Sequence, residues 1–331
     1  MALREEFSYP SSDGRHQIHA LRWLPEESGP RAVVQLVHGI SEHMGRYDGF
    51  AAYLADHGFA VVGHDHLGHG KTARGRREYG FLGEQNGWAY LVHDTRTLRE
   101  LTGERFSGLP HFLMGHSMGS FVVRTYLIDY PGTVDGCILS GTGQEPPFLV
   151  AFGRGLSGLL LRIKGGNHVS GLVTALSLGA YNRQFRPTRT SADWISRDQA
   201  VVDAYVRDPM CRFVPTVGMF HDMMEGLQFI SDPRNLRRMD PYTPVYLFSG
   251  DADPVGSRGK GVRKVAGFFR ESGCRDVTVK LYPGGRHEML NEINRDTVYQ
   301  DVLDWLELHI MTKEGGSAAL LCHDPAHFYW A

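Results

Sequence analysis

The sequence predicts an α/β fold in which helices flank a mostly parallel central sheet. Short apolar runs typical of covered strands alternate with segments of helical spacing, and this alternation favours parallel strands. The alternation stops near residue 141 and resumes near residue 240, which indicates a helical insertion. The chain has 331 residues, 42% of them hydrophobic, which is enough for a large core. We therefore expect a core of residues 1–140 and 240–311, a helical cap of residues 141–239, and a flexible tail of residues 312–331.

The first part of the core supplies six expected strands, so the cap follows the sixth. A hairpin at residues 5–24 turns at Ser12-Asp13-Gly14. The other strands are expected at residues 33–38, 59–63, 112–114 and 134–140. The helices that alternate with them are expected at residues 46–57, 87–102 and 121–128.

The second half of the chain contains the cap and the rest of the core. Cap helices are expected at residues 148–161, 169–178, 193–206 and 217–230. The core then resumes with strands at residues 244–248 and 277–282 and helices at residues 258–272 and 292–310. A Gly-Gly-Ser segment at residues 315–317 indicates a flexible linker before the last residues.

The pentapeptide from Gly115 to Gly119 lies between an expected strand and an expected helix. This G-x-S-x-G pattern in that context is typical of a nucleophile elbow, a sharp turn that exposes a reactive serine. Glycine is needed on both sides because the turn is too tight for larger residues. Ser117 is therefore the candidate nucleophile.

A serine hydroxyl needs a base to take its proton, and two later strands end in suitable residues. His287 follows the strand at 277–282, and Asp251 and Asp253 follow the strand at 244–248. The chain order serine, aspartate, histidine is the α/β-hydrolase order. Either aspartate could orient His287; we favour Asp253, which stands before the stiffening ring of Pro254. Asp251 is then a turn residue.

An oxyanion hole requires backbone N–H groups that point at the charge developing on the substrate. The first expected donor is the amide of Met118, which follows the nucleophile. The second is the amide of Ile40, because Gly39 lets the loop after the strand at 33–38 approach the substrate closely. In the same loop, Glu42 and Arg46 form either a pair that fixes the loop or a solvated surface pair; we favour the first.

Several segments together resemble the monoacylglycerol lipases and related lysophospholipases. Residues 38–47, His-Gly-Ile-Ser-Glu-His-Met-Gly-Arg-Tyr, are similar to that family's H-G-x-x-E-H-x-x-R-Y segment. Residues 115–119 are identical to its elbow, and residues 250–253 and 285–288 match its G-x-x-D segment and its histidine loop. The resemblance implies an α/β-hydrolase fold with a cap, ester hydrolysis without a cofactor, and Asp253 as the acid of the triad.

We therefore predict a serine carboxylic-ester hydrolase that cleaves monoacyl esters through an acyl-Ser117 intermediate. A serine aminopeptidase or amidase on the same fold is the main alternative, since cap acids could hold a substrate amine. The candidates for that role are Glu145, Asp193, Asp203 and Glu225. A small-ligand-binding protein without activity is a third hypothesis, which the intact set Ser117, Asp253 and His287 disfavours.

Other classes of site and partner are not indicated. Residues 64–69 are rich in histidine, but we interpret them as a packed loop in which Asp65 bonds backbone amides, so no metal is expected. Asp65 also stands where a phosphate-binding P-loop needs glycine. The formal net charge of −2 gives no indication of a nucleic-acid partner.

The expected partner is thus a small acyl ester, while the oligomeric state stays open. We expect most apolar residues of the cap segment at 148–161 to pack against the core. The functional hypothesis for this segment is an acyl tunnel or transient contact with a lipid surface. Four scattered cysteines and the lack of a recognisable signal sequence favour a cytoplasmic protein with free thiols.

Overall fold

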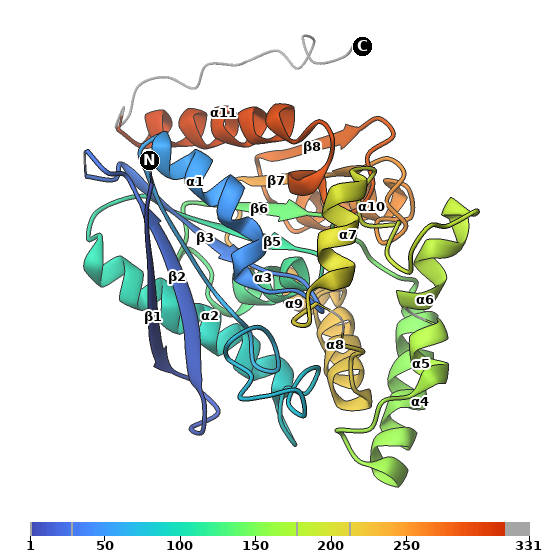
Figure 1. Cartoon of the computed structure of the whole chain (residues 1–331). Helices are drawn as coiled ribbons and strands as arrows, with labels where there is room; N and C mark the ends of the chain where they lie inside the picture. Colours follow the sequence, from blue (N-terminus) through green and yellow to red (C-terminus); the bar gives the residue numbers. More distant parts are fainter. Residues whose placement is uncertain (1, 28, 177, 212, 315–331) are drawn as a thin grey trace.

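The computed structural model describes residues 2–27, 29–176, 178–211 and 213–314 (Figure 1). Its centre is an eight-stranded sheet of order β1-β2-β4-β3-β5-β6-β7-β8. β1 and β2 are antiparallel, β2 is antiparallel to β4, and every other pair is parallel, which confirms the predicted mostly parallel sheet. The strands are β1 (Leu3–Pro10), β2 (Gln17–Leu24), β3 (Ala32–Val37), β4 (Phe59–His64), β5 (His111–His116), β6 (Gly136–Ser140), β7 (Val245–Gly250) and β8 (Val277–Tyr282).

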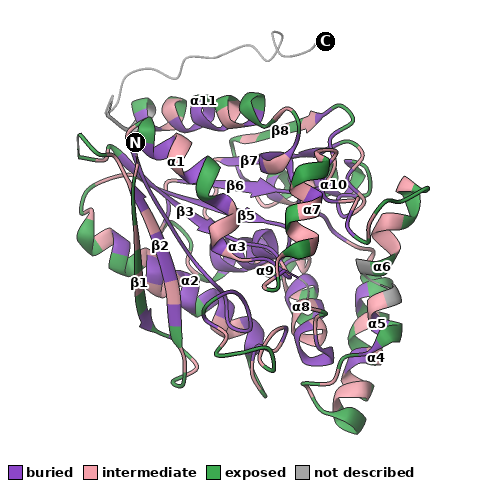
Figure 2. Ribbon diagram, in the orientation of Figure 1, coloured by how far each residue is buried: buried purple, intermediate pink, exposed green. Residues whose placement is uncertain are grey.

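Helices cover both faces of this sheet (Figure 1), and Figure 2 shows the central strands as buried. Each face has its own apolar cluster. α1 (Asp48–Asp56) and α11 (Arg295–Glu314) pack on one face; α2 (Gly87–Arg105), α3 (Met118–Asp129) and α10 (Lys260–Glu271) pack on the other. Along β3, Val33 and Val37 join one cluster while Val34 and Leu36 join the other. This alternation follows from the two-residue period of a strand, and burial on both faces explains the continuous apolar runs.

Six α-helices and one 3-10 helix (Asn182–Phe185) lie between β6 and β7 in the described part of the chain, beside the carboxyl ends of the parallel strands (Figure 1). Two glycines let α4 and α8 approach closely: a Cβ at Gly153 would lie 3.0 Å from Met224 Sδ, and one at Gly158 would lie 3.2 Å from His221 Cε1. The six are α4 (Pro147–Lys164), α5 (Gly171–Leu176), α6 (Leu178–Tyr181), α7 (Gln199–Arg207), α8 (Val217–Phe229) and α9 (Pro233–Leu236).

Several expected boundaries in the cap and at the chain end are wrong. The helix expected at 193–206 starts only at Gln199, because the Asp198 carboxylate accepts the amides of Ala200 and Val201 and caps α7 there. The helix expected at 169–178 is instead α5 and α6. At the other end, α11 extends to Glu314, into the expected tail, and residues 315–331 lie outside the described residues.

Short helical turns also precede the regular elements near the carboxyl ends of the strands. A 3-10 turn at Met44–Tyr47 comes before α1, and another at Met289–Asn291 follows the β8 loop. None of the helices in the described residues has both the length and the apolar character needed to cross a bilayer.

Candidate active site

Ser117 lies at the sharp turn between β5 and α3. Its backbone angles, φ of +53° and ψ of −122°, are a conformation that residues other than glycine rarely adopt. The flanking glycines are required by close backbone contacts: a Cβ at Gly119 would lie 2.1 Å from the Val37 carbonyl oxygen, and one at Gly115 2.5 Å from the Gly119 carbonyl oxygen. The Ser117 amide donates to the Ser140 carbonyl at 2.9 Å, which fixes the turn against β6.

The loops after β7 and β8 bring Asp253 and His287 together. His287 Nδ1 lies 3.1 and 3.0 Å from the two carboxylate oxygens of Asp253, and both side chains are buried. The carboxylate also accepts hydrogen bonds from Ser249 Oγ at 2.8 Å and from the Val255 amide at 2.9 Å. Because Nδ1 donates to Asp253, Nε2 is the nitrogen left to accept a proton.

Burial and charge act in opposite directions on His287. Burial lowers the pKa of the imidazole, whereas the charge and hydrogen bond of Asp253 raise it, and the net pKa lies above the ordinary value. The Asp253 carboxylate thus stabilises the protonated form that a general base has to reach.

The other candidate acid, Asp251, lies on a different side of the loop. It is exposed, and its Oδ1 accepts the Gly284 amide at 2.7 Å in the neighbouring loop. Asp251 therefore joins two turns, and Asp253 is the aspartate that contacts His287.

Ser117 and His287 line one small pocket together with Gly39 and Ile40. The His116 ring, next to the serine in sequence, lies 4.7 Å from the His287 ring between centroids. Among the described residues no hydrogen bond joins the serine hydroxyl to the imidazole. Such bonds are often long before substrate binds and tighten in the complex.

The two residues expected to supply the oxyanion hole, Met118 and Ile40, both line the cavity beside Ser117. Met118 is the first residue of α3, so its N–H is one of the amides for which a helix provides no acceptor. Ile40 lines the main cavity beside Ser117 and Met118. A Cβ at Gly39 would lie 3.0 Å from Ser117 Cβ, so the loop that carries Ile40 touches the elbow.

A buried charge network holds this loop. Glu42 accepts the Gly39 amide at 2.5 Å and the Tyr47 hydroxyl at 3.0 Å, both through Oε1. Arg46 donates to Glu42 Oε2 at 3.0 Å and to both carboxylate oxygens of Glu288 at 2.7 and 2.6 Å. Since Glu42 is only 4% exposed, the solvated-pair hypothesis is wrong.

Through Arg46, the loop after β3 is tied to the residue next to His287. Burial raises the pKa of Glu288, but the Arg46 guanidinium lowers it more, so this carboxylate stays ionised. Removal of either partner would leave an uncompensated buried charge.

The histidine-rich loop packs beneath this site. Asp65 accepts the Met44 amide at 2.7 Å and the Lys71 amide at 2.8 Å, so the predicted bonding of Asp65 to backbone amides is confirmed. Burial lowers the pKa of His64 and His69 to about 4, so both rings are neutral. These two rings therefore contribute packing rather than charge.

Comparison with known proteins places the chain in a family. Residues 28–294 match the family model described as Serine aminopeptidase, S33. A monoacylglycerol lipase from Mycolicibacterium smegmatis is 31% identical over 93% of this chain and 99% of its own length. The human monoglyceride lipase is 26% identical over 91% of this chain and 90% of its own length.

A solved structure agrees with these relatives. The thermostable carboxyl esterase from Bacillus coagulans, in complex with glycerol, has a TM-score of 0.86 and 30% identity, over 93% of this chain and 99% of that one. The chain belongs to the α/β-hydrolases of the monoacylglycerol lipase type. It is an enzyme, and the predictions of fold, family and serine ester hydrolase are confirmed.

The main cavity of this hydrolase opens at Ser117 and has a volume of about 380 Å³, within the usual range of roughly 300–1,000 Å³ for small-molecule sites. Ile40 and Met118 line it together with Ser117. Apolar side chains of α4 and α8 form much of the remaining wall, including Leu149, Val150, Leu156, Phe220, Met223 and Leu227.

Two residues next to His287 were not identified from the sequence. Trp194 lies 4.9 Å from the His287 ring between centroids and lines the cavity. Glu288 holds Arg46, which is 242 positions away in the chain. No local pattern marks either of them; only the position of Glu288 in the matched histidine segment could have drawn attention to it.

Proposed function

We propose that this hydrolase cleaves monoacyl esters of glycerol or glycerophosphate type, with Ser117, His287 and Asp253 as its catalytic residues. The observation that carries the proposal is the position of Ser117, at a strained turn that faces a largely apolar cavity, beside the Asp253–His287 pair. The glycerol complex of the related carboxyl esterase and the names of the monoacylglycerol lipases support this substrate class.

The proposed reaction has two halves. His287 Nε2 takes the Ser117 proton as the hydroxyl oxygen bonds to the ester carbonyl carbon, and the amides of Ile40 and Met118 stabilise the oxyanion. The protonated His287 then gives the proton to the leaving alcohol oxygen, which leaves acyl-Ser117. In the second half, His287 takes a proton from water as the water oxygen bonds to the acyl carbonyl carbon. The bond between this carbon and the serine oxygen then breaks, His287 returns the proton to the serine oxygen, and the fatty acid is released.

The apolar wall of the cavity is suited to the acyl chain. Each buried methylene contributes about 0.8 kcal/mol, so substrates gain binding energy steadily until the chain fills the cavity. We therefore expect kcat/KM to rise with chain length and then to level off or fall.

The direct test is the turnover of a series of monoacylglycerols by the Ser117→Ala variant. We expect a loss of several orders of magnitude in kcat, and no covalent labelling by a fluorophosphonate probe. The control is Ser272→Ala, at the end of α10 and distant in the fold from the cavity, which should keep normal turnover and labelling. Unchanged turnover in Ser117→Ala would refute the mechanism, and absent labelling of the wild-type protein would favour a binding protein.

An aminopeptidase or amidase activity is the second candidate, and Glu145 is the observation that favours it. This acid lines the cavity, and burial raises its pKa. The other three candidate acids have partners elsewhere: Asp193 accepts from Thr190, Asp203 pairs with Arg189, and Glu225 pairs with Arg154. Amino-acid anilides would be cleaved faster than fatty esters if this alternative holds.

We also propose that the cap contacts a lipid surface. Large apolar side chains are exposed along α4, with Phe148 70% and Ile163 63% accessible to solvent. A double change to serine at these two positions should weaken binding to phospholipid vesicles. Leu308→Ser on α11, at an equally apolar but distant exposed site, is the control and should bind as the wild type does. Equal binding of all three proteins would refute this contact.

For the cellular location we propose a reducing compartment such as the cytoplasm. The support is the state of the cysteines: Cys137, Cys211 and Cys274 are buried, free thiols. We expect the purified protein to keep its fold and its activity when reducing agents are added.

A further inference from the structure

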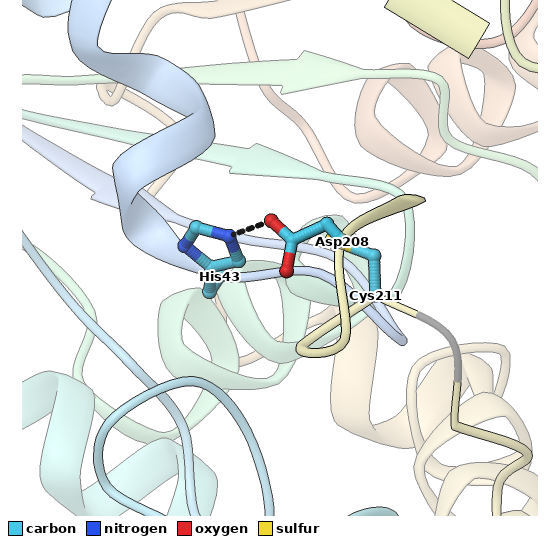
Figure 3. A group of neighbouring side chains, drawn as sticks. All are labelled: His43, Asp208 and Cys211. Carbon is cyan, nitrogen blue, oxygen red and sulfur yellow. Dashed lines mark hydrogen bonds and ion pairs between the residues drawn. The ribbon is translucent and has the colours of Figure 1, made fainter. Parts of the chain in front are cut away.

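A second group of ligand-type side chains lies where the cap meets the core, outside the proposed triad (Figure 3). His43 belongs to the loop after β3, directly after Glu42. Asp208 ends α7, and Cys211 follows in the next turn, where its amide donates to the Asp208 carbonyl at 3.1 Å. The two cap residues thus face one residue of the core.

The three side chains offer one nitrogen, one oxygen and one sulfur ligand. These atoms all lie within 4.8 Å of one another, and His43 Nε2 lies 2.9 Å from Asp208 Oδ2. Zinc binds nitrogen and oxygen at about 2.0–2.2 Å and sulfur at about 2.3 Å in a tetrahedron. Ligand atoms of such a site are therefore separated by roughly 3.3–3.7 Å. Side-chain adjustments of about an ångström would bring the three atoms to those separations.

The surroundings are compatible with a cation. The Arg46 guanidinium is already paired with two carboxylates, those of Glu42 and Glu288. Asp208 adds a further negative charge, and its Oδ1 accepts the Met210 amide, which orients the carboxylate. Cys211 is buried, whereas the side chains of His43 and Asp208 are 13% and 25% exposed, so an ion could approach from their side.

Cysteine coordinates a metal as its thiolate, so the sulfhydryl proton of Cys211 has to leave when a metal binds. Coordination would therefore release this proton to solvent as the sulfur forms its bond to the metal. A soft sulfur ligand with an imidazole and a carboxylate selects zinc-like ions over magnesium or calcium.

We propose that His43, Asp208 and Cys211 form a binding site for a thiophilic divalent cation of the zinc class. Three protein ligands leave the fourth tetrahedral position to a water molecule. A bound ion would link the cap to the loop that carries the Ile40 amide, because His43 lies in that loop. The site is independent of the proposed substrate.

Cobalt(II) provides a direct test because it takes zinc sites and gives a thiolate-to-metal charge-transfer band. The metal-free wild-type protein, kept reduced with a reductant that contains no thiol, is titrated with cobalt chloride. We expect this band to saturate at one ion per chain, and the midpoint of thermal unfolding to rise as the site fills. Zinc chloride added afterwards should displace the cobalt and abolish the band.

Variants of the three proposed ligands test whether these side chains bind the ion. Cys211→Ser should remove the band, and His43→Gln and Asp208→Asn should each lower the affinity by at least about tenfold. Cys274→Ser is the matched control, because Cys274 is also a buried free thiol, and it should keep the band. Circular dichroism establishes that each variant is folded.

The proposal is overturned if the wild type gives no thiolate band, or if the band survives in Cys211→Ser. It is also overturned if cobalt raises the unfolding midpoint of Cys211→Ser as much as that of the wild type, since the ion would then bind elsewhere among the histidines. Neither result depends on ester turnover, so the test is separate from that of the proposed function.

Discussion

Gly39 allows the loop after β3 to lie directly against the nucleophile turn. An added Cβ would lie 2.8 Å from Glu42 Oε1, 3.0 Å from Ser117 Cβ and 3.4 Å from His116 Cδ2. Neither the buried Glu42 carboxylate nor the elbow can move away freely, because Glu42 is held by Tyr47 and Arg46. A Gly39→Ala change must therefore displace the loop itself.

The expected size of the effect follows from these distances. Restoring ordinary contacts of about 3.5 Å requires displacements of roughly 0.5 Å from Ser117 and roughly 0.7 Å from Glu42. The displaced amide is that of Ile40, whose hydrogen bond to an oxyanion needs a separation of about 2.7–3.1 Å. Loss of one such donor lowers kcat by about 10²–10³, or roughly 2.7–4 kcal/mol. The added volume should also destabilise the fold by about 1–3 kcal/mol.

The assay compares kcat and KM for a p-nitrophenyl ester in the wild type, Gly39→Ala and a control. The control is Gly267→Ala in α10, where nothing lies within 4 Å of an added Cβ; it should keep full activity and gain up to about 1 kcal/mol of stability. Urea unfolding confirms that each variant is folded. If Gly39→Ala is folded and its kcat is within threefold of the wild type, the Ile40 amide does not stabilise the transition state.

Three further results are expected. Asp253→Asn should lower kcat by about 10⁴, while Asp251→Asn should leave it nearly unchanged; equal losses would contradict the assignment of the acid. Arg46→Ala should lower the free energy of unfolding by about 3–5 kcal/mol in urea titrations, since it strands two buried carboxylates, and a change below 1 kcal/mol would show that the network is not stabilising. Because the pKa of His287 is raised, kcat/KM should increase as pH rises and this base loses its proton, with a midpoint above about 6.5. A midpoint below that value would contradict the effect of Asp253.

The sequence by itself determined the features that depend on neighbours along the chain. Alternating apolar runs and helical spacing predicted the sheet and the helices that cover it, because a residue's burial in these elements follows the local period. The elbow around Ser117 was also predictable, since a turn this tight needs glycine on both sides. The order of Ser117, Asp253 and His287 along the chain, which matches the family's order, can likewise be read directly from the sequence.

Tertiary structure alone decided which side chains meet. Asp251 and Asp253 have similar sequence surroundings, and only the packing of two loops buries Asp253 against His287 while Asp251 stays exposed. Trp194 contacts His287 from the segment before α7, which the sequence had placed inside a helix. The pairing of Arg46 with Glu288 joins the segments that follow β3 and β8, strands that are far apart in the chain and are not neighbours in the sheet. Such contacts leave no periodic signal, because they form only once the carboxyl ends of the parallel strands lie side by side.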